Sequence, residues 1–173
     1  HYFRHARTGD FVVTSPLILG HEIAGEIVEI AGVAPGLKVG DRVAVNPSRW
    51  CARCRACREN RPNLCENIFF MGSASKTPHM QGGFATIFDA TPAQCVKIPD
   101  HVSYQAAALP EPLAVCLHAV ARAGDIRGRS AVLFGAGPIG LLTMPAARRA
   151  GASQLPAARP PAAPLAPAHR PGA

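Results

Sequence analysis

Short runs of apolar, often β-branched residues alternate with turn residues over the first hundred positions. Each run adjoins a glycine or a proline, which is typical of short strands joined by tight turns. The four runs are residues 22–31, 42–46, 84–88 and 94–98. We expect Gly25 to allow a bulge or a close backbone approach in the first of them. The pattern predicts a compact barrel or sandwich.

The pattern changes after residue 100. Residues 102–123 are rich in Ala and Leu, with apolar residues at helical spacing and two prolines. Because proline suits a first helical turn, we predict two short helices or one helix that restarts at Pro112. Residues 130–134 then predict a new strand, and residues 141–150 predict a helix.

This change indicates a β domain over residues 1–125 and the start of an α/β domain over residues 126–150. Residues 151–173 contain 8 Ala and 6 Pro with no hydrophobic period. Pro145, inside the preceding helical stretch, costs about 3 kcal/mol. Such a composition buries too little apolar surface to offset chain entropy. We therefore expect a disordered tail there, with no second strand of the α/β domain.

Four of the six cysteines form a cluster of two-residue spacings closed by a longer gap. They are Cys51, Cys54, Cys57 and Cys65. The spacing suits four sulfurs around one tetrahedral Zn²⁺. Disulfides are an alternative, and an iron–sulfur cluster fits less well because the last gap is seven residues and Glu66, not proline, follows. The remaining two lie in apolar segments, where we expect small buried hydrophobes: Cys95 and Cys116.

The chain is basic, with a formal net charge of +7, and five arginines crowd residues 49–61 among the cysteines. Because four thiolates on Zn²⁺ would carry net negative charge, local compensation of a metal site would explain those arginines. Nucleic-acid binding is the alternative, but no aromatic-rich basic strand or recognition helix accompanies the charge. No apolar run approaches a membrane span and no secretory leader is visible, so we expect no membrane partner and a cytoplasmic protein.

A glycine loop follows the predicted strand 130–134 and opens the next helix, which is the context of a dinucleotide-binding fingerprint. Its candidate cofactor-binding residues are Gly135, Gly137, Pro138, Ile139 and Gly140. The glycines would allow a tight turn, approach of a pyrophosphate and packing of the helix on the strand. A plain glycine-rich turn is the alternative. The acidic residue expected about 20 positions later is absent, since no Asp or Glu follows Asp125.

The chain carries three motifs in order: Gly20-His21-Glu22, the cysteine cluster and the glycine loop. In this order they resemble the zinc-dependent medium-chain alcohol dehydrogenases, especially the sorbitol/threonine dehydrogenase branch. The resemblance covers about residues 1–150. Within the branch, the segments most similar to L-idonate 5-dehydrogenases are residues 46–48, 69–74, 78–84 and 111–115.

The resemblance implies a GroES-like β-barrel catalytic domain followed by the start of a Rossmann domain. It also implies a structural and a catalytic Zn²⁺, NAD or NADP, and a homo-oligomeric parent. His21 and Glu22 match catalytic zinc ligands, and Glu111 matches a residue that reaches the zinc directly or through water. From the residues alone, His21 could instead be structural, and Glu111 could complement a helix dipole.

The implied reaction is oxidation of a secondary alcohol of a polyol or sugar acid, foremost L-idonate to 5-dehydro-D-gluconate, with sorbitol and threonine as substrate variants. His1 and Tyr2 match positions that line the polyol pocket. Arg4 or Arg7 is a candidate partner for a substrate carboxylate, with solvated surface charge as the alternative. The family's first zinc-ligating Cys precedes its His-Tyr pair, so we expect this chain alone to be inactive. A non-catalytic zinc-binding module is the alternative function.

Overall fold

The structure, a computed structural model, describes residues 2–158. Its packing divides the chain into two compact units, residues 1–111 and 112–173. The division falls after Glu111, inside one continuous helix, α4 (Pro110–Arg122). The sequence pattern places the domain boundary later, after residue 125, where the helix has ended. The two units are described separately.

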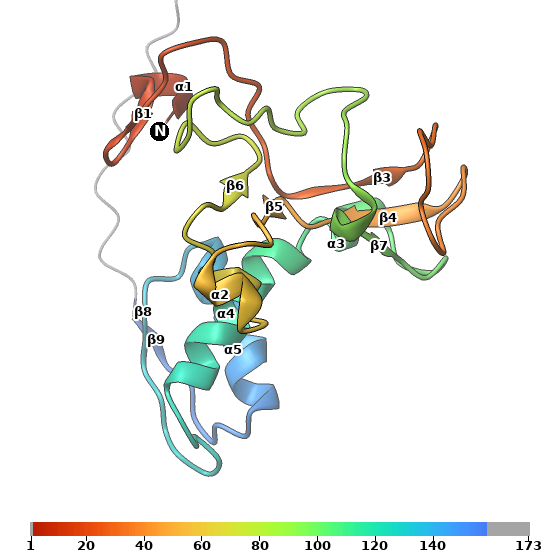
Figure 1. Ribbon diagram of the computed structural model, residues 1–173. Coiled ribbons are helices and arrows are strands. Elements are labelled where there is room, and N and C mark those ends of the chain that lie inside the picture. The colour runs from red at the N-terminus through yellow and green to blue at the C-terminus, as the bar shows by residue number, and fades with distance from the viewer. Residues whose placement is uncertain (1, 159–173) are drawn as a thin grey trace, which may run out of the picture. The chain divides into compact units, whose positions relative to one another are not determined.

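The first unit is built on a three-stranded antiparallel sheet, in the order β3 (Ile23–Glu26), β4 (Arg42–Val45) and β7 (Cys95–Lys97) (Figure 1). Ile23 pairs with Val45, and Val45 pairs with Cys95. These strands correspond to three of the four runs predicted from the sequence, although the first ends at Glu26 and not at residue 31.

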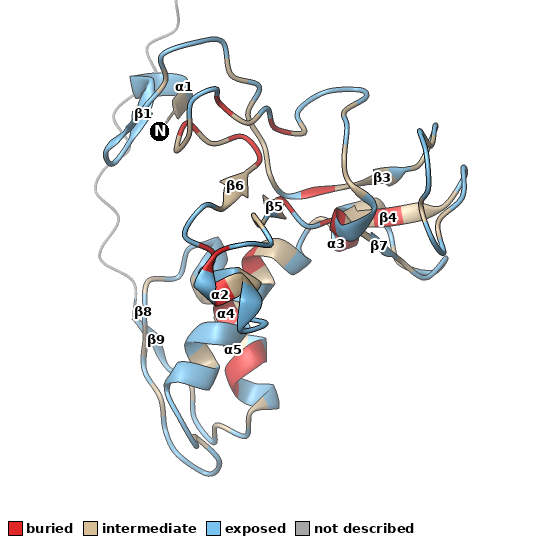
Figure 2. Ribbon diagram, viewed as in Figure 1, coloured by how far each residue is buried: buried red, intermediate tan, exposed pale blue. Residues whose placement is uncertain are grey.

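The core of this unit lies on the sheet, where parts of β3 and β4 are buried (Figure 2). Its buried members are Ile23, Val43, Val45 and Met71. Met71 comes from the segment after β6 and is only 2% exposed. This small cluster therefore joins the sheet to a distant part of the chain.

Smaller elements surround the sheet. Two antiparallel ribbons pair β1 (Arg7–Thr8) with β2 (Phe11–Val12) and β5 (Ser48–Arg49) with β6 (Phe69–Phe70). The short helices are α1 (Tyr2–His5), α2 (Arg55–Arg58), η1 (Pro62–Leu64), η2 (Pro92–Gln94) and α3 (Tyr104–Ala107). The strands of residues 2–111 thus pair as separate small sheets, less extensively than the barrel pattern predicts.

The strand predicted at residues 84–88 is wrong, because that segment forms bends. The amides of Gly82, Gly83 and Phe84 bond to carbonyl oxygens of residues 18–20 at 2.7–3.0 Å. The acceptors follow the order Ile18, Gly20 and Leu19, which is not the regular register of a strand ladder. Phe84 and Ile87 remain 75% and 70% exposed.

The second unit contains most of α4, followed by β8 (Leu133–Phe134), α5 (Pro138–Arg149) and β9 (Ala157–Ala158). The helix predicted to restart at Pro112 begins at Pro110, and the helix predicted at residues 141–150 begins at Pro138. Both helices thus begin at a proline, which suits a first helical turn. Pro145 lies inside α5 without ending it.

The prediction that no second strand follows α5 is wrong for the described residues. β9 pairs with β8 in parallel, Leu133 opposite Ala157 and Phe134 opposite Ala158. The amides of Ala131, Leu133 and Gly135 donate to carbonyl oxygens of this segment at 2.9–3.0 Å. Strand pairing uses backbone groups, which an Ala-rich segment supplies as well as any other. The rest of the predicted tail, residues 159–173, lies outside the described residues.

Among residues 2–158, no helix has the length and apolar character needed to cross a membrane.

Because Met71 fills the core beside β3 and β4, we expect Met71→Ala to lower the free energy of unfolding by about 2–5 kcal/mol. Urea denaturation followed by circular dichroism measures the change. Val96→Ala, at a position 59% exposed on β7, is the control and should change stability little. A loss below 1 kcal/mol in Met71→Ala would contradict the assigned core.

Asp41 makes the unit's stability depend on pH. Its carboxylate, 10% exposed, bonds Lys97 Nζ at 2.7 Å and the Lys38 amide at 2.8 Å. The bond from Lys97 holds the pKa of Asp41 below its ordinary value. A lowered pKa in the folded state stabilises the fold above the unfolded pKa of about 3.9 and loses that contribution as pH falls.

We therefore expect Asp41→Asn to be less stable than the wild type at pH 7, with the difference shrinking below pH of about 4. Urea midpoints measured from pH 7 to pH 3 test this. Asp10→Asn, at an exposed position, serves as the control. A difference between Asp41→Asn and wild type that is constant over this range would rule out the linkage.

Candidate functional site

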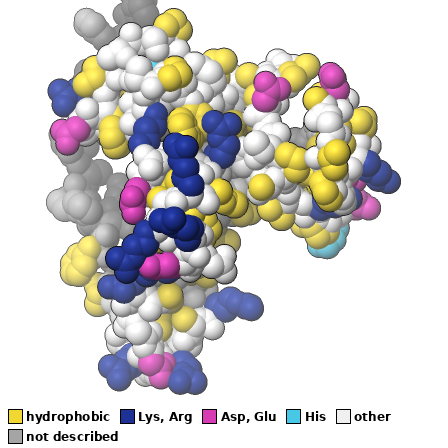
Figure 3. Space-filling model, in the orientation of Figure 1, with side chains coloured by type: hydrophobic (Ala, Val, Ile, Leu, Met, Phe, Trp, Pro, Cys, Tyr) yellow, Lys and Arg dark blue, Asp and Glu magenta, His cyan; other side chains and the backbone are white. Residues whose placement is uncertain are grey.

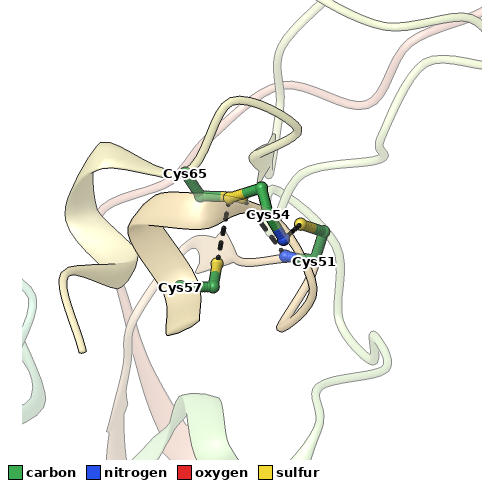
Figure 4. Close-up of side chains that lie close together, drawn as sticks. All are labelled: Cys51, Cys54, Cys57 and Cys65. Atoms are coloured by element: carbon green, nitrogen blue, oxygen red, sulfur yellow. Dashed lines mark hydrogen bonds between the residues drawn. The ribbon is translucent and has the colours of Figure 1, made fainter. Parts of the chain in front are cut away.

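The structure brings the four clustered cysteines together around one point (Figure 4). The sulfurs of Cys51, Cys54, Cys57 and Cys65 all lie within 4.8 Å of one another. Cys54 and Cys65 are buried, and the sulfurs of Cys54 and Cys57 are 3.5 Å apart. All four are free thiols in the structure. The geometry matches the convergence that a tetrahedral metal site requires.

Two short helical turns hold the sulfurs in place. Cys54 is the N-cap of α2 and Cys57 lies inside it, while Cys65 is the C-cap of η1. The Cys54 amide points at the sulfur of Cys51 at 3.4 Å, and the Cys51 amide points at the sulfur of Cys65 at 3.3 Å. Backbone N–H groups aimed at sulfur stabilise the thiolate form, which is the form that binds metal.

The electrostatics of the cluster are uneven. Backbone N–H groups of Arg53 and Cys54 lower the pKa of Cys51 to about 6. Those of Cys57 and Glu66 lower the pKa of Cys54. Burial raises the pKa of Cys57 to about 12. Without a cation, therefore, the cluster does not hold four thiolates at neutral pH, whereas a divalent ion would offset their mutual repulsion.

Five exposed arginines lie in the same stretch of chain as these cysteines, residues 49–61. Several Lys and Arg side chains lie close together on the face shown in Figure 3. Arg55 and Arg61 both pair with Glu59, at 2.6 and 3.1 Å, and the Arg49 guanidinium lies 5.1 Å from the centre of the Phe69 ring. Three of the five positive charges thus have partners within the chain. The nucleic-acid alternative gains no support from this arrangement.

The structure also brings together the second predicted set, His21, Glu22 and Glu111. Their ligand atoms lie within 4.8 Å of one another, although Glu111 is far from the other two in sequence. His21 and Glu22 directly precede β3, and Glu111 lies in the first turn of α4. His21 and Glu111 are partly buried, while Glu22 is exposed. One imidazole and two carboxylates form an ordinary donor set for Zn²⁺.

Burial raises the pKa of the Glu111 carboxyl group, and the neighbouring Glu22 adds to this rise. His21 acts in the opposite direction and lowers the pKa of Glu111. The carboxylates of Glu22 and Glu111 therefore repel each other in this partly buried space, and added positive charge would offset that repulsion. Glu111 does begin a helix, as its alternative role requires, but it also faces this cluster.

One neighbour of the site was not predicted from the sequence. The Phe70 ring meets the His21 ring edge-on, with centroids 5.2 Å apart and an interplanar angle of 62°. Phe70 lies on β6, which pairs with β5, so this strand pair positions the Phe70 ring beside His21. The signals available in the sequence were the adjacent pair Phe69-Phe70 in a chain with few aromatic residues and the family resemblance of residues 69–74.

Tyr2, the predicted substrate residue, lies on α1 and is partly buried. Its hydroxyl oxygen accepts a hydrogen bond from the Ala74 amide at 3.3 Å. His1, paired with it in the sequence argument, lies outside the described residues.

A pocket of about 410 Å³ in the first unit includes none of the predicted site residues. Its polar lining residues are Arg49, His79, Gln81 and Asp89, and two of them are bonded within the chain. The Thr14 amide donates to His79 Nε2 at 2.9 Å, and the Ile18 amide donates to the Gln81 side chain at 2.6 Å. We assign the pocket no chemistry.

In the second unit, the glycine loop connects β8 to α5 as predicted. Gly135 has a φ of 103°, which favours glycine. A Cβ on Gly140 would overlap the Gly135 carbonyl oxygen, whereas a Cβ on Gly137 would meet nothing within 4 Å. Gly137 is the N-cap of α5, and Pro138 and Ile139 begin its exposed first turn. Gly140 is thus needed for local packing, and Gly137 leaves open space beside the helix start.

The two remaining cysteines behave as small side chains. Cys116 is fully buried, and its thiol donates to the Ile139 carbonyl oxygen at 3.3 Å, which joins α4 to α5. Cys95 is partly buried on β7, and burial raises its pKa.

Comparison with known proteins identifies relatives of both sequence and structure. Residues 2–100 match the alcohol dehydrogenase GroES-like domain. A sorbitol dehydrogenase of Bacillus subtilis is 43% identical over 88% of the chain and 42% of its own length. A probable D-xylulose reductase A of Aspergillus fumigatus is 42% identical over 89% of the chain and 42% of its own length.

The L-idonate 5-dehydrogenase (NAD(P)(+)) of Escherichia coli is 36% identical over 89% of the chain and 44% of its own length. Its crystal structure superimposes with a TM-score of 0.85 over 91% of this chain and 45% of that one. The chain thus spans less than half the length of the relatives it matches.

We expect the four-cysteine cluster to hold about one tightly bound Zn²⁺ per chain at pH 7, as four converging sulfurs suit a structural site. Cys57→Ser should abolish this binding and lower the thermal midpoint, because a structural metal contributes directly to folding. Elemental analysis and thermal scans measure both effects. Cys95→Ser is the matched control and should retain the metal. Disulfides among the four cysteines in a non-oxidised sample would contradict the site.

Proposed function

Since this chain belongs to the alcohol dehydrogenase GroES-like domain family, we propose that it carries the zinc-binding catalytic part of an enzyme that oxidises a secondary alcohol with NAD or NADP. The observation that supports this most directly is the meeting of His21, Glu22 and Glu111 from separate segments. The proposed substrate class is polyols and sugar acids. L-idonate, oxidised to 5-dehydro-D-gluconate, is the first candidate, because its Escherichia coli dehydrogenase is similar in structure.

The residues present fit two different zinc roles. Four sulfur donors without room for a substrate suit a structural ion, whereas one imidazole and two carboxylates leave a position open, as catalytic sites do. The chemistry supplied by a Zn²⁺ ion bound at His21, Glu22 and Glu111 is Lewis-acid polarisation of the substrate hydroxyl. The nicotinamide cofactor would accept the hydride.

In this proposal, the side chains of the site hold and orient the metal ion. The position of His21 is fixed by β3, which begins two residues later, and by the Phe70 ring, which meets the His21 ring edge-on. Glu111, whose pKa is raised by burial, keeps a proton more readily than an exposed carboxyl group does. It can therefore act as a metal ligand in its ionised form or as a partner to a bound water molecule in its protonated form.

Tyr2 is proposed to line the substrate pocket. Its hydroxyl accepts one hydrogen bond from the chain and retains its own proton to donate. Arg4 and Arg7, both exposed near the same end of the chain, are candidates to pair with the carboxylate of a sugar acid. Arg7 already donates to the Gly9 carbonyl oxygen at 2.8 Å, which makes Arg4 the freer of the two.

The glycine loop is proposed to bind the pyrophosphate of the nicotinamide cofactor. Gly135, Gly137 and Gly140 provide the turn and the open approach, and Pro138 and Ile139 begin α5. The helix N-terminus presents backbone N–H groups, which favour phosphate oxygens.

The test is an activity assay of the gene product that carries this chain, with L-idonate, sorbitol, xylitol and threonine against NAD and NADP. We expect His21→Ala to reduce kcat/KM by at least about 100-fold, because losing a metal ligand costs no less than losing a supporting residue. His101→Ala, at an exposed position of the same unit, is the matched control.

Unchanged turnover in His21→Ala would refute the proposed site. Turnover of sorbitol without turnover of L-idonate would refute the substrate assignment while leaving the site intact.

A further inference from the structure

The backbone just before His21 is hydrogen-bonded to a second segment of the chain. The Ile18, Leu19 and Gly20 carbonyl oxygens accept hydrogen bonds from the amides of residues 82–84 at 2.7–3.0 Å. The Gln81 side chain adds two hydrogen bonds to this set. It accepts from the Ile18 amide at 2.6 Å and donates to the Pro16 carbonyl oxygen at 3.1 Å. Residues 16–20 are thus bound along their length.

Two glycines make this approach possible. A Cβ on Gly82 would overlap the carbonyl oxygens of Leu19 and Gly20. A Cβ on Gly72 would lie 2.8 Å from the Gly20 nitrogen and 2.9 Å from its oxygen. These neighbours are backbone atoms, which cannot turn aside as the end of a side chain can. Any larger residue at either position must therefore displace the Gly20 peptide.

The two gripping segments are also joined to each other. The Gly72 amide donates to the Met80 carbonyl oxygen at 3.0 Å, and Ser73 forms an antiparallel bridge with Met80. The first segment begins with Phe70, whose ring touches the ring of His21. One clasp, made of residues 70–73 and 80–84, therefore contacts both the backbone before His21 and the imidazole itself.

His21 and Glu22 span the gap between two fixed points. On one side is Gly20, held by the clasp, and on the other is Ile23, paired with Val45 in the sheet. Gly20 has a φ of 97°, so the chain turns sharply just before His21. A displacement of the Gly20 peptide would therefore change the direction in which the His21 side chain points.

We propose that Gly82, together with Gly72, is a positioning residue for the His21–Glu22–Glu111 site, and that its missing side chain sets how well the three donors converge on a metal ion. This inference rests on the proposed function, because it requires that the site binds metal. Gly82 does not touch the ion or the substrate, and acts through the Gly20 peptide.

The test is Gly82→Ala in the full chain, because Gly82, unlike Gly72, has no positive φ that alanine would strain. The cysteine cluster is first filled with one equivalent of Zn²⁺, and Co²⁺ is then titrated while its visible absorption is recorded. We expect at least about tenfold weaker Co²⁺ binding, as for the loss of other residues that orient metal ligands. Zinc content and the thermal midpoint are measured in parallel.

Gly25→Ala is the matched control, since Gly25 lies on β3 beyond His21 and a Cβ there meets nothing within 4 Å. It should bind Co²⁺ like the wild type. A merely structural effect of Gly82→Ala would lower the thermal midpoint but leave the Co²⁺ affinity of the folded protein unchanged, and that result would overturn the inference.

If Gly82→Ala does not fold, Gln81→Ala loosens the same clasp without adding an atom. We expect a smaller but measurable loss of Co²⁺ affinity, and unchanged affinity in this variant would also overturn the inference. Absence of Co²⁺ binding by the zinc-filled wild type is a different outcome, which would refute the proposed metal site itself.

Discussion

The peptide of Gly20 has backbone atoms packed closely around it, and the position of the candidate catalytic site depends on this close approach. Gly72 and Gly82 both lie where any side chain would collide with it. The amides of residues 82–84 donate hydrogen bonds to the carbonyl groups brought together there. Backbone polar groups that are removed from water need such partners. The sheet, the β6 ribbon and the site share this one contact region.

The two candidate metal sites of the chain are assembled in different ways. The cysteine cluster is local, since all its sulfurs come from residues 51–65 and two short helical turns, α2 and η1, suffice to orient them. The cluster of His21, Glu22 and Glu111 joins segments that are far apart in sequence. Closing a long loop costs more chain entropy than closing a short one, so this second site depends on the fold around it.

The second unit shows how far composition can mislead. The Ala- and Pro-rich stretch after α5 has no hydrophobic pattern, yet Ala157 and Ala158 pair in parallel with β8. The adjoining backbone bonds, from Ser153 to Arg129 and from Ala131 to Gln154, align this segment before the strand begins. A hydrophobic period reports which side chains are buried, whereas strand pairing here uses the backbone of exposed residues.

The sequence by itself determined the cysteine cluster, the glycine loop before α5 and the strands of the central sheet, because spacing, turn residues and β-branched runs act over short distances. It named His21, Glu22 and Glu111 only through family resemblance. Their meeting, the Phe70 ring against His21, the bends at residues 84–88 and the β9 pairing were decided by tertiary structure alone. Each of these depends on contacts between distant segments, whose geometry no local pattern of residues encodes.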